Sequence, residues 1–496
     1  MKTLLGIDIG TSSIKGMLLD IESGEVHVAK CKYGVSIPQE NHAEQDPRIW
    51  WNGLVHVLGQ LRNDPASEQA FRSIAGIGYS GQMHGMVCLG ADGEPVRPSI
   101  IWLDQRSGRQ MDEIHATLTE DEIGSVLHNP ICSGFLFPSL LWMKECEPDN
   151  YRATGTVFQP KDYIRYRMTG SIGTDVTDAS ATGLYAIERR DWAWTFIDRF
   201  RLDRSLFPES HESTEIAGYV SRECAEQTGL REGIPVIYGC GDQMAQSIGN
   251  GVYGEGRLIS NIGTGGQVSA YAKSFIADSR MRTNTFCHAV GGGYSVFGAT
   301  LNSGGSLNWL TGKVLSLGDN GFGECNELAA QISPGSDGLI YLPYLSGERT
   351  PILNPNAKGV YFGLQLRHDR RHFIRATMEG IVYGLKDCLM VLQHLGMDSD
   401  EIIASGGGAG SELFLQLQAD IFEKRIRVCN VKEQACLGAC ILAGNGLDLF
   451  GLEDASHRFV SFSDKEHSPD PANLDVYRQC FEKFHAVYEH TRQLMH

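Results

Sequence analysis

Two features that mark whole classes of protein are missing from this sequence: long apolar runs and an excess of basic residues. No stretch of the 496 residues approaches the roughly 20 consecutive apolar residues of a membrane-spanning helix. Lysine and arginine number 43 against 60 aspartates and glutamates, which gives a formal net charge of −17. We therefore expect neither a nucleic acid nor a membrane as partner. An anionic ligand would need local donors, because the global field repels it.

Paired cysteines are missing as well. The 13 cysteines show no CxxC spacing, and the closest two are Cys436 and Cys440. An odd number without a repeating spacing favours reduced thiols and argues against a disulfide framework or a zinc site. The N-terminus has no basic segment followed by an apolar run and a small-residue cleavage site, so we expect no signal peptide. These features predict a cytoplasmic protein.

The length of the chain and the order of its segments predict two α/β domains. A chain of 496 residues is too long for one core, and its strand-like runs alternate with helical ones. Residues 257–271 repeat the plan of residues 4–20, in which a Gly-Thr turn separates two apolar strands. This echo indicates a duplicated domain with a cleft between the copies, although two hairpins can share Gly-Thr by chance. We place the domains at residues 1–244 and 245–496.

Periodicity places several further elements. Buried strands are expected at residues 74–79 and 234–238. Apolar residues at helical spacing predict a helix over 373–395 that ends at Gly396. The chain should close on a helix with one apolar face, made by Tyr477, Phe481, Phe484 and Tyr488.

The first turn of the chain suits a phosphate and a metal ion. An apolar run that contains Asp8 ends in the turn Gly10-Thr11-Ser12-Ser13, after which a second apolar run begins. Backbone N–H groups and hydroxyls in such a turn can bind phosphate oxygens, and Asp8 suits the Mg²⁺ that accompanies a nucleotide. The alternative is a hairpin turn that uses glycine and serine only for their backbone freedom.

A glycine-rich turn late in the chain points to the same kind of ligand. Residues 402–405 predict a strand, Gly406-Gly407-Gly408 a turn, and residues 412–422 a helix. Glycines let a flat ligand or a phosphate approach the backbone, and a helix N-terminus offers free N–H donors. Tight packing between strand and helix also selects glycine, so a purely structural role is the alternative.

Asp242 is the candidate general base. It follows the strand expected at 234–238, and ligands of α/β sheets collect at the carboxyl ends of strands. A carboxylate held there can take a proton from a substrate hydroxyl. The alternative role is that of an N-cap for a helix that starts at Gln243, and both roles can hold at once.

Polar residues in apolar surroundings suggest a site for a polyhydroxylated ligand. Gln82, Met83 and His84 follow a predicted strand, and Trp102, Asp104 and Arg106 recur at a spacing of two. On a strand this spacing points all three to one face, where the indole would stack and the charged groups would bind hydroxyls. The structural alternatives are a satisfied His84 and an internal ion pair between Asp104 and Arg106.

Motifs of one enzyme family occur in order over nearly the whole chain. They read Gly6-Ile7-Asp8-Ile9-Gly10-Thr11-Ser12, Gln45-Asp46-Pro47, Gly81-Gln82-Met83-His84-Gly85, Pro160-Lys161-Asp162-Tyr163, Phe286-Cys287-His288-Ala289, Gly347-Glu348-Arg349-Thr350-Pro351 and Gly406-Gly407-Gly408. On these motifs the chain resembles the FGGY family of sugar kinases and, within it, the xylulose kinases. The Gln-Met-His-Gly element is the most specific to that branch.

The resemblance implies two duplicated actin-like (ribonuclease H-like) domains around a central cleft, with the sugar held mostly by the first and ATP by the second. It implies Asp242 as the catalytic base and Asp8 as the carboxylate near Mg²⁺. For the phosphates and the nucleotide it implies Thr11, Ser12, Ser13, Thr264, Gly265, Gly304, Asn308, Gly407 and Gly408. For the sugar it implies Gln82, Met83, His84, Trp102, Asp104, Arg106 and Asp242.

The implied reaction is phosphorylation of a primary hydroxyl of a ketopentose by ATP, from D-xylulose to D-xylulose 5-phosphate. ATP and Mg²⁺ are the expected cofactors, and a homodimer is one expected assembly. Two departures leave the sugar open: Leu103 stands where the family has asparagine, and Gln243 stands where asparagine follows the base. The alternatives are a kinase for ribulose, L-xylulose or a deoxy sugar, and a nucleotide-driven binding protein of the actin or chaperone type.

Overall fold

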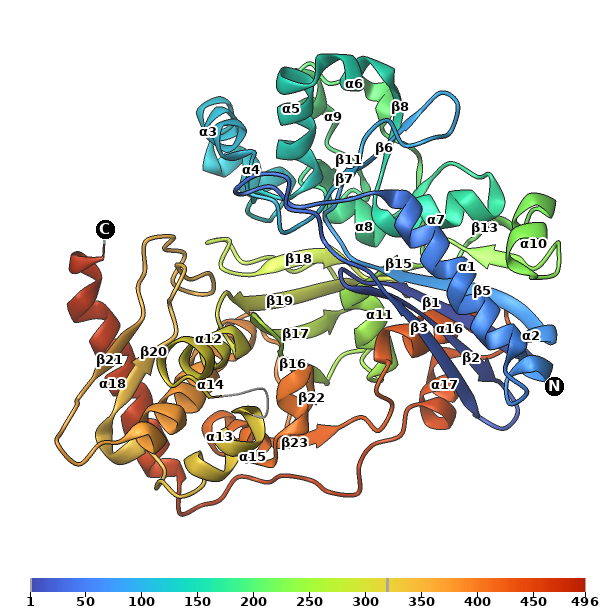
Figure 1. The fold of residues 1–496 in the computed structure, drawn as a ribbon. Coiled ribbons are helices and arrows are strands. Elements are labelled where there is room, and N and C mark those ends of the chain that lie inside the picture. The colour runs from blue at the N-terminus through green and yellow to red at the C-terminus, as the bar shows by residue number, and fades with distance from the viewer. Residues whose placement is uncertain (1, 318–320, 496) are drawn as a thin grey trace.

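The computed structural model describes residues 2–317 and 321–495. Two large sheets organise these residues, one in each half of the chain (Figure 1). The first sheet has the strand order β13-β14-β5-β1-β2-β3, with β15 paired to β5. The second has the order β18-β19-β17-β16-β22-β23. Helices alternate with these strands along the chain, so the predicted α/β class is confirmed.

The first sheet grows from the predicted hairpin. In it β2 pairs antiparallel with both β1 and β3, while β5 lies parallel to β1 on the other side. The strand expected at 234–238 is shorter, because the chain pairs as β14, turns, and pairs with β5 again as β15. The strands of this sheet are β1 (Thr3–Ile9), β2 (Ser13–Asp20), β3 (Val26–Lys32), β5 (Ile74–Gly81), β13 (Ile216–Tyr219), β14 (Pro235–Ile237) and β15 (Cys240–Gly241).

The second sheet repeats this arrangement. An antiparallel hairpin, β16 and β17, is extended by antiparallel β19, and β22 lies parallel to β16 as β5 lies parallel to β1. The duplication predicted from the sequence echo is thus confirmed in the topology. The strands are β16 (Leu258–Ile262), β17 (Gly266–Ala272), β18 (Asn284–Cys287), β19 (Tyr294–Thr300), β22 (Glu401–Ser405) and β23 (Arg425–Val428).

The predicted helices are present with small shifts in their bounds. The helix expected at 373–395 is α14 (Arg370–His394), which packs against β17 and β19, and the helix expected at 412–422 is α15 (Glu412–Phe422). The closing helix is α18 (Leu474–Thr491), and its predicted apolar face is buried. The other helices of the second half are α12 (Gly304–Trp309), α13 (Gly321–Ala329), α16 (Gln434–Gly446) and α17 (Leu452–Phe459).

Two helices cover opposite faces of the first sheet (Figure 1). Leu5, Ile7 and Ile9 of β1 pack against α1 (Pro47–Asn63), whose N-cap Asp46 accepts from the Arg48 N–H at 3.0 Å. The alternate residues of β1 face α16, which comes from the second half of the chain, and α16 also packs on α11 (Asp242–Gly249). The domain boundary between residues 244 and 245 stays a prediction.

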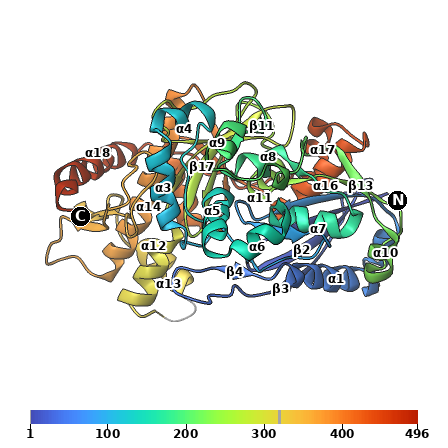
Figure 2. The same ribbon diagram turned by 90° about the horizontal axis from the view of Figure 1, so that it is seen from above.

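A cap of smaller elements is inserted between β5 and β13 and lies above the first sheet in Figure 1. Figure 2 shows the two chain ends at opposite sides of the molecule. Among the described residues, no helix combines the length and the apolar character needed to cross a membrane. In the second half, β20 (Ile340–Leu342) and β21 (Val360–Phe362) form an antiparallel pair. The remaining elements of the first half are β4 (Glu44–Gln45), α2 (Glu68–Arg72), β6 (Val87–Gly90), β7 (Ser99–Ile100), α3 (Gly108–Thr117), α4 (Glu120–Val126), α5 (Leu136–Cys146), α6 (Pro148–Ala153), β8 (Thr154–Phe158), α7 (Pro160–Thr169), β9 (Thr174–Asp175), α8 (Val176–Ser180), β10 (Tyr185–Ala186), β11 (Asp191–Trp192), α9 (Trp194–Arg199), β12 (Ser210–His211) and α10 (Arg222–Thr228).

Candidate active site

Asp8 lies near the end of β1, on the face that α16 covers. The Ser80 hydroxyl on neighbouring β5 donates to Asp8 Oδ1 at 2.9 Å. Lys15 Nζ lies 3.8 Å from Asp8 Oδ2 and 2.7 Å from Glu433 Oε2, and Glu433 is the residue before α16. Burial raises the pKa of Asp8, while Lys15 opposes that shift. Asp8 is therefore a buried carboxylate with one cation beside it.

The turn after Asp8 is tied to the predicted sugar residues. Thr11 Oγ1 accepts from the Trp102 indole N–H at 2.9 Å and lies 3.3 Å from Gln82 Oε1. Gln82 Nε2 donates to Gln45 Oε1 at 2.9 Å, and Gln45 in turn donates to the Thr11 carbonyl oxygen. Ser12 is exposed and Ser13 partly exposed beside this network. The structure thus brings the first turn and Trp102 together.

Asp242 directly follows β15. Cys240 and Gly241 of β15 pair with Ser80 and Gly81 of β5, and Asp8 of β1 pairs with Ser80 from the other side of β5. The pKa of Asp242 is raised to about 7 by burial and, secondly, by the negative charge of Asp8. A carboxyl group with this pKa can accept a proton near neutral pH.

The N-cap position considered for Asp242 is wrong. The helix begins at Asp242 and not at Gln243, and its N-cap is Gly241. The Gln243 N–H in the first turn nevertheless bonds to the Asp242 carboxylate and opposes the rise in its pKa. A carboxylate has two acceptor oxygens, so this bond leaves Asp242 able to bind a substrate hydroxyl as well.

Met83 and His84 lie beside this strand end. A Cβ added to Gly241 would lie 2.7 Å from Met83 Sδ, which shows how closely Met83 covers the residue before Asp242. His84 Nδ1 lies 2.7 Å from the Ala181 carbonyl oxygen, and its ring stacks on Phe135 with centroids 4.1 Å apart. Burial lowers the pKa of His84 to about 4, so the ring is neutral at pH 7. Nδ1–H donates to the carbonyl, which leaves Nε2 as an acceptor.

The expectation that Trp102, Asp104 and Arg106 share one face of a strand is wrong. Trp102 and Arg106 lie in turns and Asp104 lies between them without regular structure, so a spacing of two gives no common direction here. Asp104 is 0% exposed and accepts from the Ala43 N–H at 2.6 Å. Arg106 pairs with Asp104 at 2.8 Å and with Glu44 at 2.7 Å. The internal ion pair that we considered as the structural alternative is present, and Trp102 stands 44% exposed next to it.

The second Gly-Thr turn is closed by the segment that precedes α12. The Ser303 and Gly305 N–H groups donate to the Thr264 carbonyl oxygen, and the Gly304 N–H donates to the Gly263 oxygen, each at 2.9 Å. A Cβ on Gly304 would lie 2.5 Å from that Gly263 oxygen, so glycine is required here. Thr264 is exposed and Gly265 partly so, and Asn308 is exposed on α12.

The third glycine turn lies on the end of β16. Gly406 has φ +74°, and an added Cβ would lie 2.2 Å from Asn261 Oδ1. A Cβ on Gly408 would lie 2.6 Å from the Ile262 Cβ, while Gly407 is exposed. The turns at 263–265, 304 and 406–408 therefore meet at one end of β16, although they are far apart in the chain.

Sequence reasoning missed several members of the site. Ser80 and Lys15 contact Asp8, and Gln45 contacts Thr11 and Gln82. Glu433 joins the site through Lys15. The motif that contains Gln45 was noted in the sequence but carried no assigned role. For a metal ion, the described residues contain no group of three or more His, Cys, Asp or Glu side chains. A single carboxylate such as Asp8 fits Mg²⁺, which binds through one or two carboxylates together with substrate phosphates.

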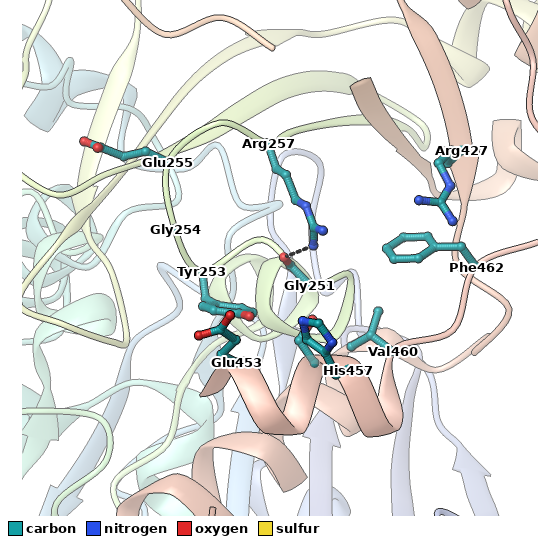
Figure 3. A pocket seen from close by; sticks show the side chains of 11 residues that line it. Gly251, Tyr253, Gly254, Glu255, Arg257, Arg427, Glu453, His457, Val460 and Phe462 are labelled. Atoms are coloured by element: carbon teal, nitrogen blue, oxygen red, sulfur yellow. Dashed lines mark hydrogen bonds between the residues drawn. The ribbon is translucent and has the colours of Figure 1, made fainter. Parts of the chain in front are cut away.

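A pocket of about 430 Å³ lies elsewhere, between α17 and the start of β16 (Figure 3). Arg257 and Arg427 point into it, and Arg257 donates to the Gly251 carbonyl oxygen at 3.0 Å. The residues predicted for the site are all described, and none of them lines this pocket. The pocket is thus separate from the candidate active site.

Comparison with known proteins matches both halves of the chain to one family. The FGGY family of carbohydrate kinases matches with its N-terminal domain over residues 3–249 and with its C-terminal domain over residues 259–447. Xylulose kinases of Lactococcus lactis and Bacillus subtilis are 35% and 32% identical, each covering 100% of this chain and 98% of the relative. The crystal structure of xylulose kinase from Rhodospirillum rubrum superposes with a TM-score of 0.92 at 28% identity and covers 100% of both chains.

Proposed function

Because the chain belongs to the FGGY family of carbohydrate kinases, we propose that it phosphorylates D-xylulose with ATP to give D-xylulose 5-phosphate. The choice of sugar rests on the similarity to xylulose kinases over the full length of the chain. The observation that carries the chemistry is the position of Asp242 at the strand end beside Asp8, with its pKa raised to about 7.

The reaction needs a base and an aligned acceptor. Asp242 takes the proton of the primary hydroxyl as that oxygen forms a bond to the γ-phosphorus of ATP. The bond from the γ-phosphorus to the bridging oxygen breaks at the same time, and ADP leaves with that electron pair. Alignment of the two reactants can supply roughly 7–11 kcal/mol of the barrier, and a general base about 10²–10⁴-fold in rate.

The glycine turns would hold the nucleotide. Thr11, Ser12 and Ser13 of the first turn, with Thr264 and Gly265 of the second, would bind phosphate oxygens through hydroxyls and backbone N–H groups. The adenosine would lie against the turns that meet at the end of β16, contributed by Gly304, Asn308, Gly407 and Gly408. Close packing of these glycines leaves backbone surface that a flat ligand can approach.

Asp8 would hold Mg²⁺ on the phosphate side. Its carboxylate is buried and lies beside the Lys15 cation, which favours the charged form of Asp8. A charged carboxylate oxygen is the kind of ligand that Mg²⁺ prefers. When bound, Mg²⁺ supplies neutralisation of the charge on the phosphates. Asp242, which lies across β5 from it, keeps the role of the base.

The sugar would lie over Met83 and His84. A neutral His84 offers Nε2 as an acceptor for a sugar hydroxyl, since Nδ1–H is committed to Ala181. Trp102 offers an exposed indole, and Gln82 positions the first turn. Asp104 and Arg106 act on the sugar through the turn that carries Trp102, because their own charges are paired.

Leu103 is the reason to test a sugar other than D-xylulose as substrate. It is 43% exposed beside Trp102 and offers no hydrogen bond, where the family has an amide. Ribulose, L-xylulose or a deoxy sugar is the second candidate substrate. Release of ADP, measured against a panel of ketoses and polyols, tests this choice. Stimulation by D-xylulose well above the other sugars is expected, and ATP hydrolysis that is indifferent to every sugar would overturn the kinase proposal.

The role of Asp242 is tested by Asp242→Asn. Turnover should fall by at least about 10²-fold while ATP still binds, because the amide cannot accept the proton. Asp121→Asn is the matched control, since Asp121 also lies in the first turn of a helix but is exposed. An active Asp242→Asn protein would contradict the assignment.

The homodimer and the cytoplasmic location stay predictions. Sedimentation analysis measures whether the protein is a dimer.

A further inference from the structure

A buried ionic cluster lies beneath the segment that carries Asp242. It consists of Lys161 on α7 and three aspartates, Asp162, Asp175 and Asp178, all 0% exposed, and we call it the Lys161 cluster. Lys161 Nζ lies 2.7 Å from Asp162, 2.8 Å from Asp175 and 3.2 Å from Asp178. Charges buried this deeply are costly unless they are paired, so the cluster has a strongly preferred geometry.

One hydroxyl connects this cluster to the active site. Asp175 is the N-cap of α8, and its Oδ2 accepts from the Thr177 hydroxyl at 2.7 Å and from the Ser213 hydroxyl at 2.7 Å. Thr177 Oγ1 in turn accepts from the Gly241 N–H at 2.9 Å. Because the hydroxyl proton is committed to Asp175, the Thr177 oxygen is oriented to accept from Gly241.

The Gly241 peptide is the last backbone group before Asp242. β15 is only two residues long, and α11 begins directly after it with Asp242. The hydrogen bond from Gly241 to Thr177 therefore adds a fixed point where strand pairing ends. α8, which carries Thr177, also contacts the proposed sugar site. The carbonyl of Ala181, one residue beyond α8, accepts from His84.

We propose that Thr177 is a positioning residue for phosphoryl transfer: its hydroxyl, oriented by Asp175 in the Lys161 cluster, holds the Gly241 N–H and so aims Asp242 at the acceptor hydroxyl. This inference rests on the proposed role of Asp242 as the base. α8 then sets the distance between the base and His84. A displacement of about 1 Å at such a base can cost about 10²-fold in rate.

Thr177→Val tests the proposal, because valine keeps the shape and removes the hydroxyl. We expect kcat to fall about 10²-fold, while KM for ATP stays within about twofold, since the nucleotide turns are on other elements. Ser213→Ala is the matched control: it also removes a hydroxyl that donates to Asp175 Oδ2 at 2.7 Å, but it does not touch Gly241. Its kcat should stay within about threefold of the wild type.

Thr177→Ser should restore kcat, because serine can make both hydrogen bonds. Thermal unfolding of all variants separates loss of stability from loss of rate, and Thr177→Ala replaces Thr177→Val if the latter does not fold. Equal losses of kcat in the Thr177 and Ser213 variants, or a Thr177→Ser protein as slow as Thr177→Val, would overturn the proposal. If Asp242→Asn is inactive in that case, only the positioning role fails, whereas an active Asp242→Asn protein defeats the proposed function itself.

Discussion

Asp8 and Asp242 are the same residue type at neighbouring strand ends, and their surroundings separate them. Burial favours the neutral form of both, but Lys15 lies beside Asp8 and stabilises its charge. Asp242 instead feels the negative charge of Asp8. Two carboxyl groups whose surroundings differ in this way can have different roles: one binds cations and the other accepts a proton.

The pKa of Asp242 gives a prediction of pH dependence. In the ligand-free protein Asp242 should titrate near pH 7, against an ordinary value of 3.8, because burial and Asp8 both favour the protonated form. Below that pH the base is protonated, so kcat/KM for the sugar should fall with falling pH and level off above it. Infrared difference titration of the wild type against Asp242→Asn reports the carboxyl directly.

Asp121→Asn is the control for that titration, because it removes one exposed carboxyl group but keeps Asp242, and it should leave the Asp242 signal unchanged. An Asp242 signal that titrates below about pH 5 would contradict the expected raised pKa.

At the scale of elements, α16 is placed by glycines that allow backbones to touch. A Cβ on Gly438 of α16 would lie 1.9 Å from the Ala245 carbonyl oxygen of α11, and one on Gly78 of β5 would lie 2.0 Å from the Ala439 oxygen. No side chain fits at these distances. The approach of α16 to α11 and to the first sheet therefore depends on glycine, which explains why this helix can cover Asp8 and bring Glu433 to Lys15.

Two helical glycines should respond oppositely to alanine. Gly438→Ala should lower the free energy of unfolding by about 1–3 kcal/mol, because α16 and α11 must separate. Gly59→Ala in α1 should raise it by about 0.5–1 kcal/mol, because alanine is the better helix former. A Cβ at Gly59 would meet no heavy atom within 4 Å in the described part of the chain. Urea unfolding measures both, and a stabilising Gly438→Ala would contradict the packing.

At the scale of the molecule, the halves are joined by hydrogen bonds as well as by α16. Asn129 in the cap donates through Nδ2 to the Thr285 carbonyl oxygen at 2.7 Å and accepts the Thr285 N–H at 2.6 Å. Its amide thus pairs with the edge strand β18 as another strand would. Ser180, at the end of α8, accepts from the Cys287 N–H on the same strand at 3.2 Å. Both contacts attach the first half to the second sheet.

Removal of the Asn129 amide should weaken this attachment. Asn129→Ala leaves the buried N–H and C=O of Thr285 without that partner, and each unsatisfied group costs about 1–3 kcal/mol. Asn150→Ala is the control, since the Asn150 amide donates to Glu147 within one local turn, and it should cost under about 0.5 kcal/mol. Equal losses in urea unfolding for the two variants would show that Asn129 does not join the halves.

Much of the fold could be predicted because it depends on local pattern. The hairpin at Gly10–Ser13, its repeat at Gly263–Gly265 and the helix at 412–422 follow from short-range periodicity and glycine placement. The family followed from the order of short motifs and is confirmed over both halves. The turn around Asp104 could not be predicted as such, because a spacing of two gives a common face only if the backbone is extended.

The sequence by itself determined which segments turn, which strands pair with their neighbours, and which carboxylates belong to the motifs. Only the tertiary structure decided which of these groups meet. Thr177 reaches Gly241 across 64 residues, and Glu433 reaches Lys15 from the other half of the chain. Such contacts depend on how helices cover a sheet, and no local periodicity encodes that. For this reason Asp8 and Asp242 could be named from the sequence, whereas the groups that hold them in place became visible only in the fold.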